Sequence, residues 1–300
     1  MKPSTVIYIA ISVLIMLIGM FICSAATASA EASNTDIYYS KENEAGDMVF
    51  TYDFTENNIR KLSIETLDAD INIYKVQGNS YIELINFADG TYTFSYTNRI
   101  VSLTNNTNLS NLLQFGTNNF YFDGLRHYLR GISDPNKSKT VNVYVGSDSA
   151  IQSVVLSAAS GDISLASMTN TCDYSITVSD GKADISSITS AGTFEFSGDN
   201  ASLSVKDIVC DSFKASVHNG NISTSNMSSA NSVYANTDAG NITLGLTRPI
   251  TEYKAKLNSV KGTVSVYGNI YEMGYNDPVE NSADINLEVS VNTGNITITE

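Results

Sequence analysis

The fold is decided by a short phrase, Ser160-Gly161-Asp162-Ile163-Ser164-Leu165, which returns in altered form through the second half of the chain. The later copies are Asp180-Gly181-Lys182-Ala183-Asp184-Ile185, Gly198-Asp199-Asn200-Ala201-Ser202-Leu203, Asn219-Gly220-Asn221-Ile222-Ser223, Ala239-Gly240-Asn241-Ile242-Thr243-Leu244, Lys261-Gly262-Thr263-Val264-Ser265-Val266 and Thr293-Gly294-Asn295-Ile296-Thr297-Ile298. Aligned on an aliphatic residue after the glycine, from Ile163 and Ile185 onward, the steps are 22, 18, 19, 20, 22 and 32 residues. A spacing near 20 residues predicts stacked supersecondary units, none of which buries its apolar face alone.

Each glycine lies between two runs in which apolar and polar residues alternate. The runs before the glycine include 174–178, 212–217 and 286–291. Strict alternation predicts half-buried strands, with Phe213, Ala215 and Val217 on one side and Lys214 on the other. A tight corner requires a positive φ, which a Cβ makes costly. We therefore predict structural turns at Gly161, Gly181, Gly220, Gly240, Gly262 and Gly294.

Two all-β folds fit a unit of strand, corner, strand and loop. Asn-Gly and Asp-Gly are also strong hairpin signals, which would give an antiparallel β-sandwich. The near-constant spacing, with the same chemistry at equivalent positions, favours a parallel β-solenoid with repeats of about 20 residues. In that fold the apolar columns form one continuous interior.

The rhythm divides the chain into segments. Residues 31–47 are polar and read as a spacer, and 48–300 read as the β-solenoid. Leu62-Ser63-Ile64 and Ala69-Asp70-Ile71-Asn72-Ile73 form a degenerate first repeat. Residues 102–138 interrupt the pattern as an insertion, and Val141-Asn142-Val143-Tyr144-Val145 resumes it.

The run through 141–145, followed by Ser153-Val154-Val155-Leu156 and Ser160-Gly161-Asp162-Ile163-Ser164-Leu165, resembles the bacterial DUF4097 domain, a family of candidate adhesins. The family has a V-x-V-x-V-P strand, a short apolar strand and then S-G-D-I-x-I, and Gly146 stands here where proline is frequent. The resemblance extends from about Leu62 to the C-terminus, without the insertion. It implies a right-handed parallel β-helix outside the cytoplasm, with some members in membrane-stress sensing. It brings no catalytic residues.

The N-terminus predicts export. Residues 6–22 are uncharged and apolar, Lys2 precedes them, and Ala26-Thr27-Ala28 and Ala28-Ser29-Ala30 fit small-x-small cleavage sites. Residues 1–30 are thus a signal peptide or a retained membrane anchor. The remainder of the chain carries a net charge of −15, because the whole carries −14 and Lys2 is the only charged residue before position 31. Nucleic acid is therefore excluded as a partner, and contact with a membrane is expected only through the N-terminal segment.

The sequence has no motif that carries catalysis. It lacks a nucleophile elbow, a phosphate loop and a zinc-binding helix, and its only histidines are His127 and His218. Asp162, Asp180, Asp184 and Asp199 lie near successive corners, where oxygen-rich edges can hold calcium, but the glycine-rich ladder of calcium-binding β-rolls is missing. We expect solvated carboxylates, no metal and no cofactor. Cys172 and Cys210 are two coils apart, about 10 Å, which is too far for a disulfide, so we expect unpaired thiols.

The insertion has a distinctive composition. Residues 120–132 gather aromatic and basic side chains, and Leu125, Tyr128, Leu129 and Ile132 have helical spacing. A short amphipathic helix here would either cover a solenoid edge or form a contact site. In the second case the binding residues would be Tyr121, Arg126, His127 and Tyr128.

These observations favour a non-catalytic, extracytoplasmic β-solenoid for adhesion or envelope interaction, with an envelope protein or a surface glycan as its partner. The alternatives are a membrane-anchored envelope-stress sensor or accessory subunit, and a glycan-active β-helix enzyme with paired carboxylates.

Overall fold

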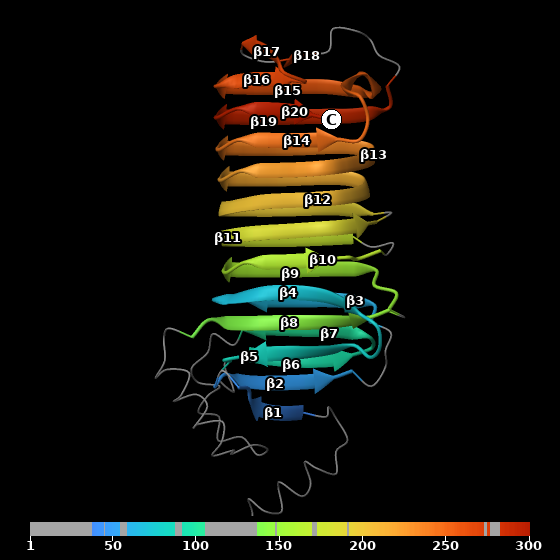
Figure 1. Ribbon diagram of the computed structural model, residues 1–300, viewed down its shortest axis with the longest axis vertical. Coiled ribbons are helices and arrows are strands. Elements are labelled where there is room, and N and C mark those ends of the chain that lie inside the picture. Colours follow the sequence, from blue (N-terminus) through green and yellow to red (C-terminus); the bar gives the residue numbers. More distant parts are fainter. Residues whose placement is uncertain are drawn as a thin grey trace, which may run out of the picture.

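The chain folds into one tall stack of β-strands (Figure 1). The computed structural model describes residues 38–300 except 45, 55–58, 88–91, 106–136, 148, 170–172, 191, 273–274 and 277–282. The one helical element in these described ranges is a single 3₁₀ turn, η1 (Ile250–Glu252). The all-β prediction is therefore confirmed. The predicted helix of the insertion and the N-terminal segment 1–30 lie outside the described residues.

The strands in chain order are β1 (Tyr38–Glu42), β2 (Met48–Asp53), β3 (Lys61–Thr66), β4 (Ala69–Val76), β5 (Tyr81–Ile85), β6 (Tyr92–Thr97), β7 (Ile100–Asn105), β8 (Lys139–Gly146), β9 (Ser153–Ser160), β10 (Ile163–Ala166), β11 (Asp173–Thr189), β12 (Thr193–Asn219), β13 (Ile222–Ala239), β14 (Ile242–Leu246), β15 (Tyr253–Lys261), β16 (Thr263–Val266), β17 (Asn269–Glu272), β18 (Tyr275–Asn276), β19 (Ile285–Thr293) and β20 (Ile296–Thr299).

Two strands and the corner between them form one coil, and neighbouring coils pair in parallel. In the first ladder Val154 pairs with Tyr174, and Tyr174 pairs with Phe194. In the second ladder Ile163 pairs with Ala183, and Ala183 pairs with Leu203, again 20 residues apart. Strands β11, β12 and β13 run round the corner, so each belongs to both ladders. The chain thus has parallel pairing between coils, and antiparallel pairs occur toward the two ends, as in β1–β2 and β16–β17.

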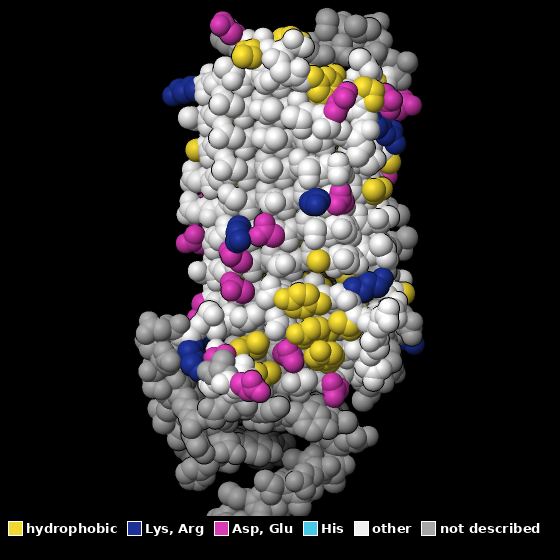
Figure 2. Space-filling model, viewed as in Figure 1, with side chains coloured by type: hydrophobic (Ala, Val, Ile, Leu, Met, Phe, Trp, Pro, Cys, Tyr) yellow, Lys and Arg dark blue, Asp and Glu magenta, His cyan; other side chains and the backbone are white. Residues whose placement is uncertain are grey.

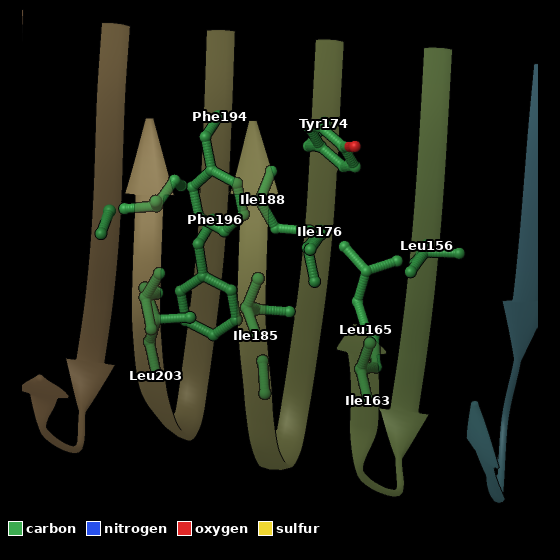
Figure 3. Close-up of a cluster of buried hydrophobic side chains, with 14 of the residues drawn as sticks. Leu156, Ile163, Leu165, Tyr174, Ile176, Ile185, Ile188, Phe194, Phe196 and Leu203 are labelled. Carbon is green, nitrogen blue, oxygen red and sulfur yellow. The ribbon is translucent and has the colours of Figure 1, made fainter. Parts of the chain in front are cut away.

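The interior is built from apolar columns, one residue per coil (Figure 3). In the first ladder Phe194 stacks on Phe213 with ring centroids 5.4 Å apart, and Tyr174 lies one coil below. The column of the second ladder is aliphatic and fully buried: Ile71, Ile163, Ala183, Leu203, Ile222, Ile242, Ile296 and Val264. A coil alone would leave its share of these columns in water, so each coil depends on its neighbours.

The corner glycines are required by close approach between coils. Gly220, Gly240 and Gly294 have φ of 152°, 151° and 140°. A Cβ at Gly240 would overlap the carbonyl oxygen of Gly220, and one at Gly294 would overlap that of Gly240. A positive φ was expected at every corner glycine. Gly262 is an exception, because its backbone is not left-handed. It is nevertheless restricted, because a Cβ there would overlap the carbonyl oxygen of Gly294.

The residue after the glycine links one coil to the next. Asn221 Oδ1 accepts a hydrogen bond from the backbone N–H of Asn241 (2.8 Å), and Asn241 Oδ1 accepts one from Asn295 (2.9 Å). Asn295 continues the series to the N–H of Thr263, at 2.9 Å. The recurring Gly-Asn therefore combines an unhindered corner with a side-chain acceptor for the next coil.

We expect Asn241→Ala to lower the free energy of unfolding by about 1 kcal/mol, because the Asn295 N–H loses its acceptor at an exposed corner. Chemical denaturation measures the change. Asn258→Ala on β15 is the matched control and should shift stability by less than about 0.5 kcal/mol, since Asn258 is exposed and away from a corner. Equal losses in both variants would contradict a coil-linking role for Asn241.

A second corner, which the sequence pattern did not predict, follows the second ladder. Ser187, Asp207 and Asn226 each have a left-handed backbone, with φ of 55°, 55° and 52°. Asn226 Nδ2 donates to Asp207 Oδ1 one coil away, at 2.6 Å. Asp and Asn tolerate this conformation better than other non-glycine residues, but a single such residue in each coil gave no glycine signal in the sequence.

At both ends the spatial order of the coils departs from the sequence order. β19 lies between β13 and β15, and β20 lies between β14 and β16 (Figure 1). The chain therefore completes its end coil first and then returns to insert the last coil beneath it. This excursion explains the 32-residue step. At the other end, β3 likewise lies between β7 and β9, and β4 between β8 and β10.

Two segment boundaries and one strand register differ from those predicted. The proposed spacer 31–47 contains β1, which pairs antiparallel with the edge of β2. The proposed insertion 102–138 contains most of β7 at its start, because Leu103 continues the buried alternation. The sequence alignment placed Ile185 opposite Ile163, whereas the register places Ala183 there. Ala183 and Ile185 lie on the same face of the strand, so the alternation of apolar and polar residues cannot tell which of them pairs with Ile163.

Candidate functional site

The four binding residues predicted in the insertion, Tyr121, Arg126, His127 and Tyr128, lie outside the described residues. Their role stays a prediction. The described surface has a different aromatic feature, which we call the tyrosine stack: Tyr74 on β4, Tyr144 on β8 and Tyr81 on β5.

The tyrosine stack spans three neighbouring strands of the second ladder. The ring centroids of Tyr74 and Tyr144 are 5.3 Å apart, and those of Tyr81 and Tyr144 are 4.2 Å apart. All three rings lie on the outer face, because their sequence neighbours Ile73, Val143 and Ile82 are buried. Figure 2 shows hydrophobic side chains gathered over β4, β8 and β5, on a face that is otherwise mostly polar.

Two carboxylates adjoin the tyrosine stack. Asp53 pairs in register with Tyr81 on the adjacent strand β2, and Glu83 is two residues from Tyr81 on the same face. The Tyr144 hydroxyl donates to Glu83 Oε2 at 3.1 Å. Burial, then the Glu83 charge, raises the pKa of Tyr144, and burial followed by Glu83 and Asp53 raises that of Tyr81. The phenols of Tyr81 and Tyr144 therefore stay neutral, and the charge beside the tyrosine stack is negative.

The contact among these three tyrosines could not be predicted from the sequence. Alternation places each of them on an outer face, but their contact depends on β4 pairing with β8 and β8 pairing with β5. Tyr81 and Tyr144 are 63 positions apart in the sequence, and the insertion lies between them. No short-range pattern signals that pairing.

The corner aspartates form links between coils. Asp162 Oδ1 accepts the N–H of Lys182 at 3.0 Å, and the Lys182 ammonium lies 3.1 Å from Asp184 Oδ2. Within the described ranges no group of three or more His, Cys, Asp or Glu side chains is arranged to hold a metal ion. Among the same residues, no helix has the length and apolar character needed to cross a bilayer.

His218 lies on the exposed surface of β12. Its Nδ1 is 2.7 Å from Asp238 Oδ2, and Asn292 Nδ2 donates to Asp238 Oδ1 at 2.7 Å. The pair joins adjacent coils across the surface.

Cys210 is a free, buried thiol on β12, two residues after the buried Ile208. Burial, with a smaller contribution from the Asp211 carboxylate, raises its pKa to about 12. A neutral, enclosed thiol is a poor nucleophile. Cys172, which was also predicted to be an unpaired thiol, lies outside the described residues.

We expect Cys210, in a Cys23→Ser and Cys172→Ser background, to react with a disulfide reagent at pH 8 about 100-fold faster in denaturant than in the native protein. The raised pKa adds a pH effect. The pKa of the Cys210 thiol is higher in the folded protein than in the unfolded chain. The contribution of this thiol to stability is therefore full below about pH 9 and is lost as pH rises toward 12. Urea unfolding at pH 7 and pH 10 measures it. Rapid native labelling at pH 8 would contradict the burial.

Comparison with known proteins gives one family and several distant structures. A family model described as Toastrack DUF4097 matches residues 59–229. No curated protein matches the chain. A candidate cell adhesion protein of Clostridium sporogenes has 14% identity and a TM-score of 0.32, covering 88% of this chain and 99% of its own. A candidate adhesin of Bacteroides fragilis has 11% identity and a TM-score of 0.36, covering 83% and 96%.

Proposed function

The chain belongs to the Toastrack DUF4097 family, and on that premise we propose that it is a non-catalytic binding protein of the cell surface, used for adhesion or for contact with another envelope component. The observation that carries this proposal is the combination of a long stack of coils with an exposed tyrosine stack on a largely polar face. A continuous apolar interior makes such a stack stiff, so it presents a side chain at a fixed place.

The absence of enzymatic activity is part of the proposal. The carboxylates of Asp162 and Asp184 both contact the ammonium group of Lys182, so these aspartates take part in structural contacts at the corner. We further propose that the coils wind in the right-handed sense typical of parallel β-solenoids.

Extracytoplasmic location is supported by the N-terminal sequence. The uncharged run 6–22 and the small residues that follow it are typical of export signals, while the length of the run also suits a membrane anchor. A retained anchor favours the second candidate function, a membrane-bound sensor or accessory subunit whose partner is another envelope protein.

Fractionation of native cells tests the location. N-terminal sequencing should give a start near Glu31 for a secreted protein, or an intact N-terminus in the membrane fraction for an anchored one. Surface labelling by a membrane-impermeant reagent should mark the protein in intact cells. Recovery of full-length protein in the cytoplasm would overturn the proposal.

Attachment tests the binding role. Beads coated with the purified protein should bind whole cells or envelope fragments more than beads coated with heat-denatured protein do. Crosslinking followed by purification of the tagged chain then separates a surface glycan from an envelope protein as partner. Beads that bind neither cells nor envelope would contradict the proposal.

A further inference from the structure

The tyrosine stack ends beside charge that nothing in the described chain neutralises. Asp53 and Glu83 form no ion pair with any described lysine or arginine, although other carboxylates, such as Asp184 and Glu288, do. Asp53 is exposed and Glu83 is half-buried. Two unpaired carboxylates next to an aromatic surface create a local negative potential.

The ring of Tyr81 has one face against Tyr144 and the other toward β2, where Asp53 is its register partner. Adjacent strands lie about 4.8 Å apart, so Asp53 follows Tyr81 at the spacing of the next ring in the series. The π-face of an aromatic ring attracts a cation held within about 6 Å of the centroid. A cation lying against the outer part of the Tyr81 ring, above the shorter Asp53 side chain, would contact both the ring and the carboxylate.

From this juxtaposition we propose that Tyr81, Asp53 and Glu83 bind an arginine or lysine side chain on a protein partner. The proposal rests on the proposed binding function and names the chemistry of its ligand. An arginine fits best, because its planar guanidinium stacks on an aromatic face while its N–H groups donate to carboxylates. Glu83 is held toward the site by the Tyr144 hydroxyl, at 3.1 Å.

The surroundings favour a cationic segment over a neutral ligand. The chain carries a net charge of −14, so a basic partner is attracted over a longer range than the contact itself. Tyr74 and Tyr144 extend the apolar surface beyond the cation, with Tyr74 39% exposed. An adjoining apolar residue of the partner has a surface to pack against.

The test uses the full chain purified from cells and a peptide of four Gly-Arg repeats, with four Gly-Gln repeats as the neutral probe. At 150 mM ionic strength the screening length is about 8 Å, so distant charges contribute little. We expect the arginine peptide to bind and the glutamine peptide not to bind. Asp53→Asn with Glu83→Gln should weaken binding about tenfold, and Tyr81→Leu about fivefold. Tyr81→Phe should stay within about twofold, because it keeps the ring.

The matched control removes the same charge elsewhere. Glu195→Gln with Asp199→Asn changes two exposed carboxylates on β12 and should alter affinity less than about twofold. Circular dichroism and melting temperature confirm that each variant is folded. An equal loss in the control pair, unchanged binding by Tyr81→Leu, or no binding by the wild-type chain would each overturn the proposal.

The same variants also test whether the ligand is a carbohydrate. Binding of a neutral glycan that is lost in Tyr81→Leu but kept in the Asp53→Asn, Glu83→Gln variant would replace the cationic partner and overturn the proposal. Cell fractionation tests export independently of the peptide experiment. If the peptide does not bind, the proposed surface location is still supported by a surface fraction. If the protein is cytoplasmic but binds the peptide, only the proposed location is refuted.

Discussion

Removing residues 283–300 is expected to unfold the end coil made by β15 and β16 while the coils below it stay folded. The deletion takes out β19 and β20, the sole parallel neighbours of β15 and β16 in the described structure. It also removes six buried aliphatic side chains: Ile285, Leu287, Val289, Val291, Ile296 and Ile298. At about 1.5–3 kcal/mol for each, the lost burial is on the order of 10 kcal/mol.

Because each coil contacts only its neighbours, this loss stays local. Hydrogen exchange should show that the backbone amides of β15 and β16 lose protection, whereas those of β11 and β12 keep it. Protection of β15 equal to that in the full chain would contradict the expected unfolding, because it would mean that β15 pairs directly with β13 when β19 is missing.

A pair of substitutions on β19 provides a control without truncation. Leu287 is fully buried, whereas Glu288 is exposed and forms an ion pair with Lys256 at 3.3 Å. Leu287→Asn should cost roughly 3 kcal/mol or more, because it removes apolar volume and buries an amide. Glu288→Asn should cost less than about 1 kcal/mol, as is typical of an exposed ion pair. Similar losses would show that β19 is not inserted between two coils.

Local patterns predicted the coil, and long-range pairing decided the rest. The alternation in 174–178 and 286–291 predicted strands because side chains in a strand face opposite sides in turn. The glycine spacing predicted stacking because a corner without Cβ recurs in most coils, although Ala201 holds that position in one of them. Neither pattern contains the order of coils in space, so the insertion of β19 beneath β15 could not be predicted.

The candidate site was even less accessible from sequence. The insertion is distinctive in the sequence because aromatic and basic residues gather there within thirteen positions, 120–132. The tyrosine stack draws its members from 74, 81 and 144, each flanked by ordinary alternation. Single tyrosines on a strand are common. They become a distinctive surface only when the ladder β4–β8–β5 places them in contact, and Asp53 joins them through β2.

The corner glycines should tolerate no side chain where coils approach closely, and Gly240→Ala is expected to cost about 3–5 kcal/mol of unfolding free energy. Part of this is the left-handed backbone, φ 151°, which costs an alanine roughly 1–2 kcal/mol. The remainder comes from the overlap between the new Cβ and the carbonyl oxygen of Gly220, which forces two backbones apart. Urea denaturation of the two proteins measures the difference.

Gly78→Ala separates these two contributions. Gly78 also has a left-handed backbone, with φ 128°, but a Cβ there meets no atom within 4 Å. The substitution should therefore cost only the conformational part, about 1–2 kcal/mol. A larger loss for Gly240→Ala identifies the contact between coils as the reason for glycine at the corner. Equal losses at the two positions would mean that backbone conformation alone explains it, and the close approach of the coils would then be without consequence for stability.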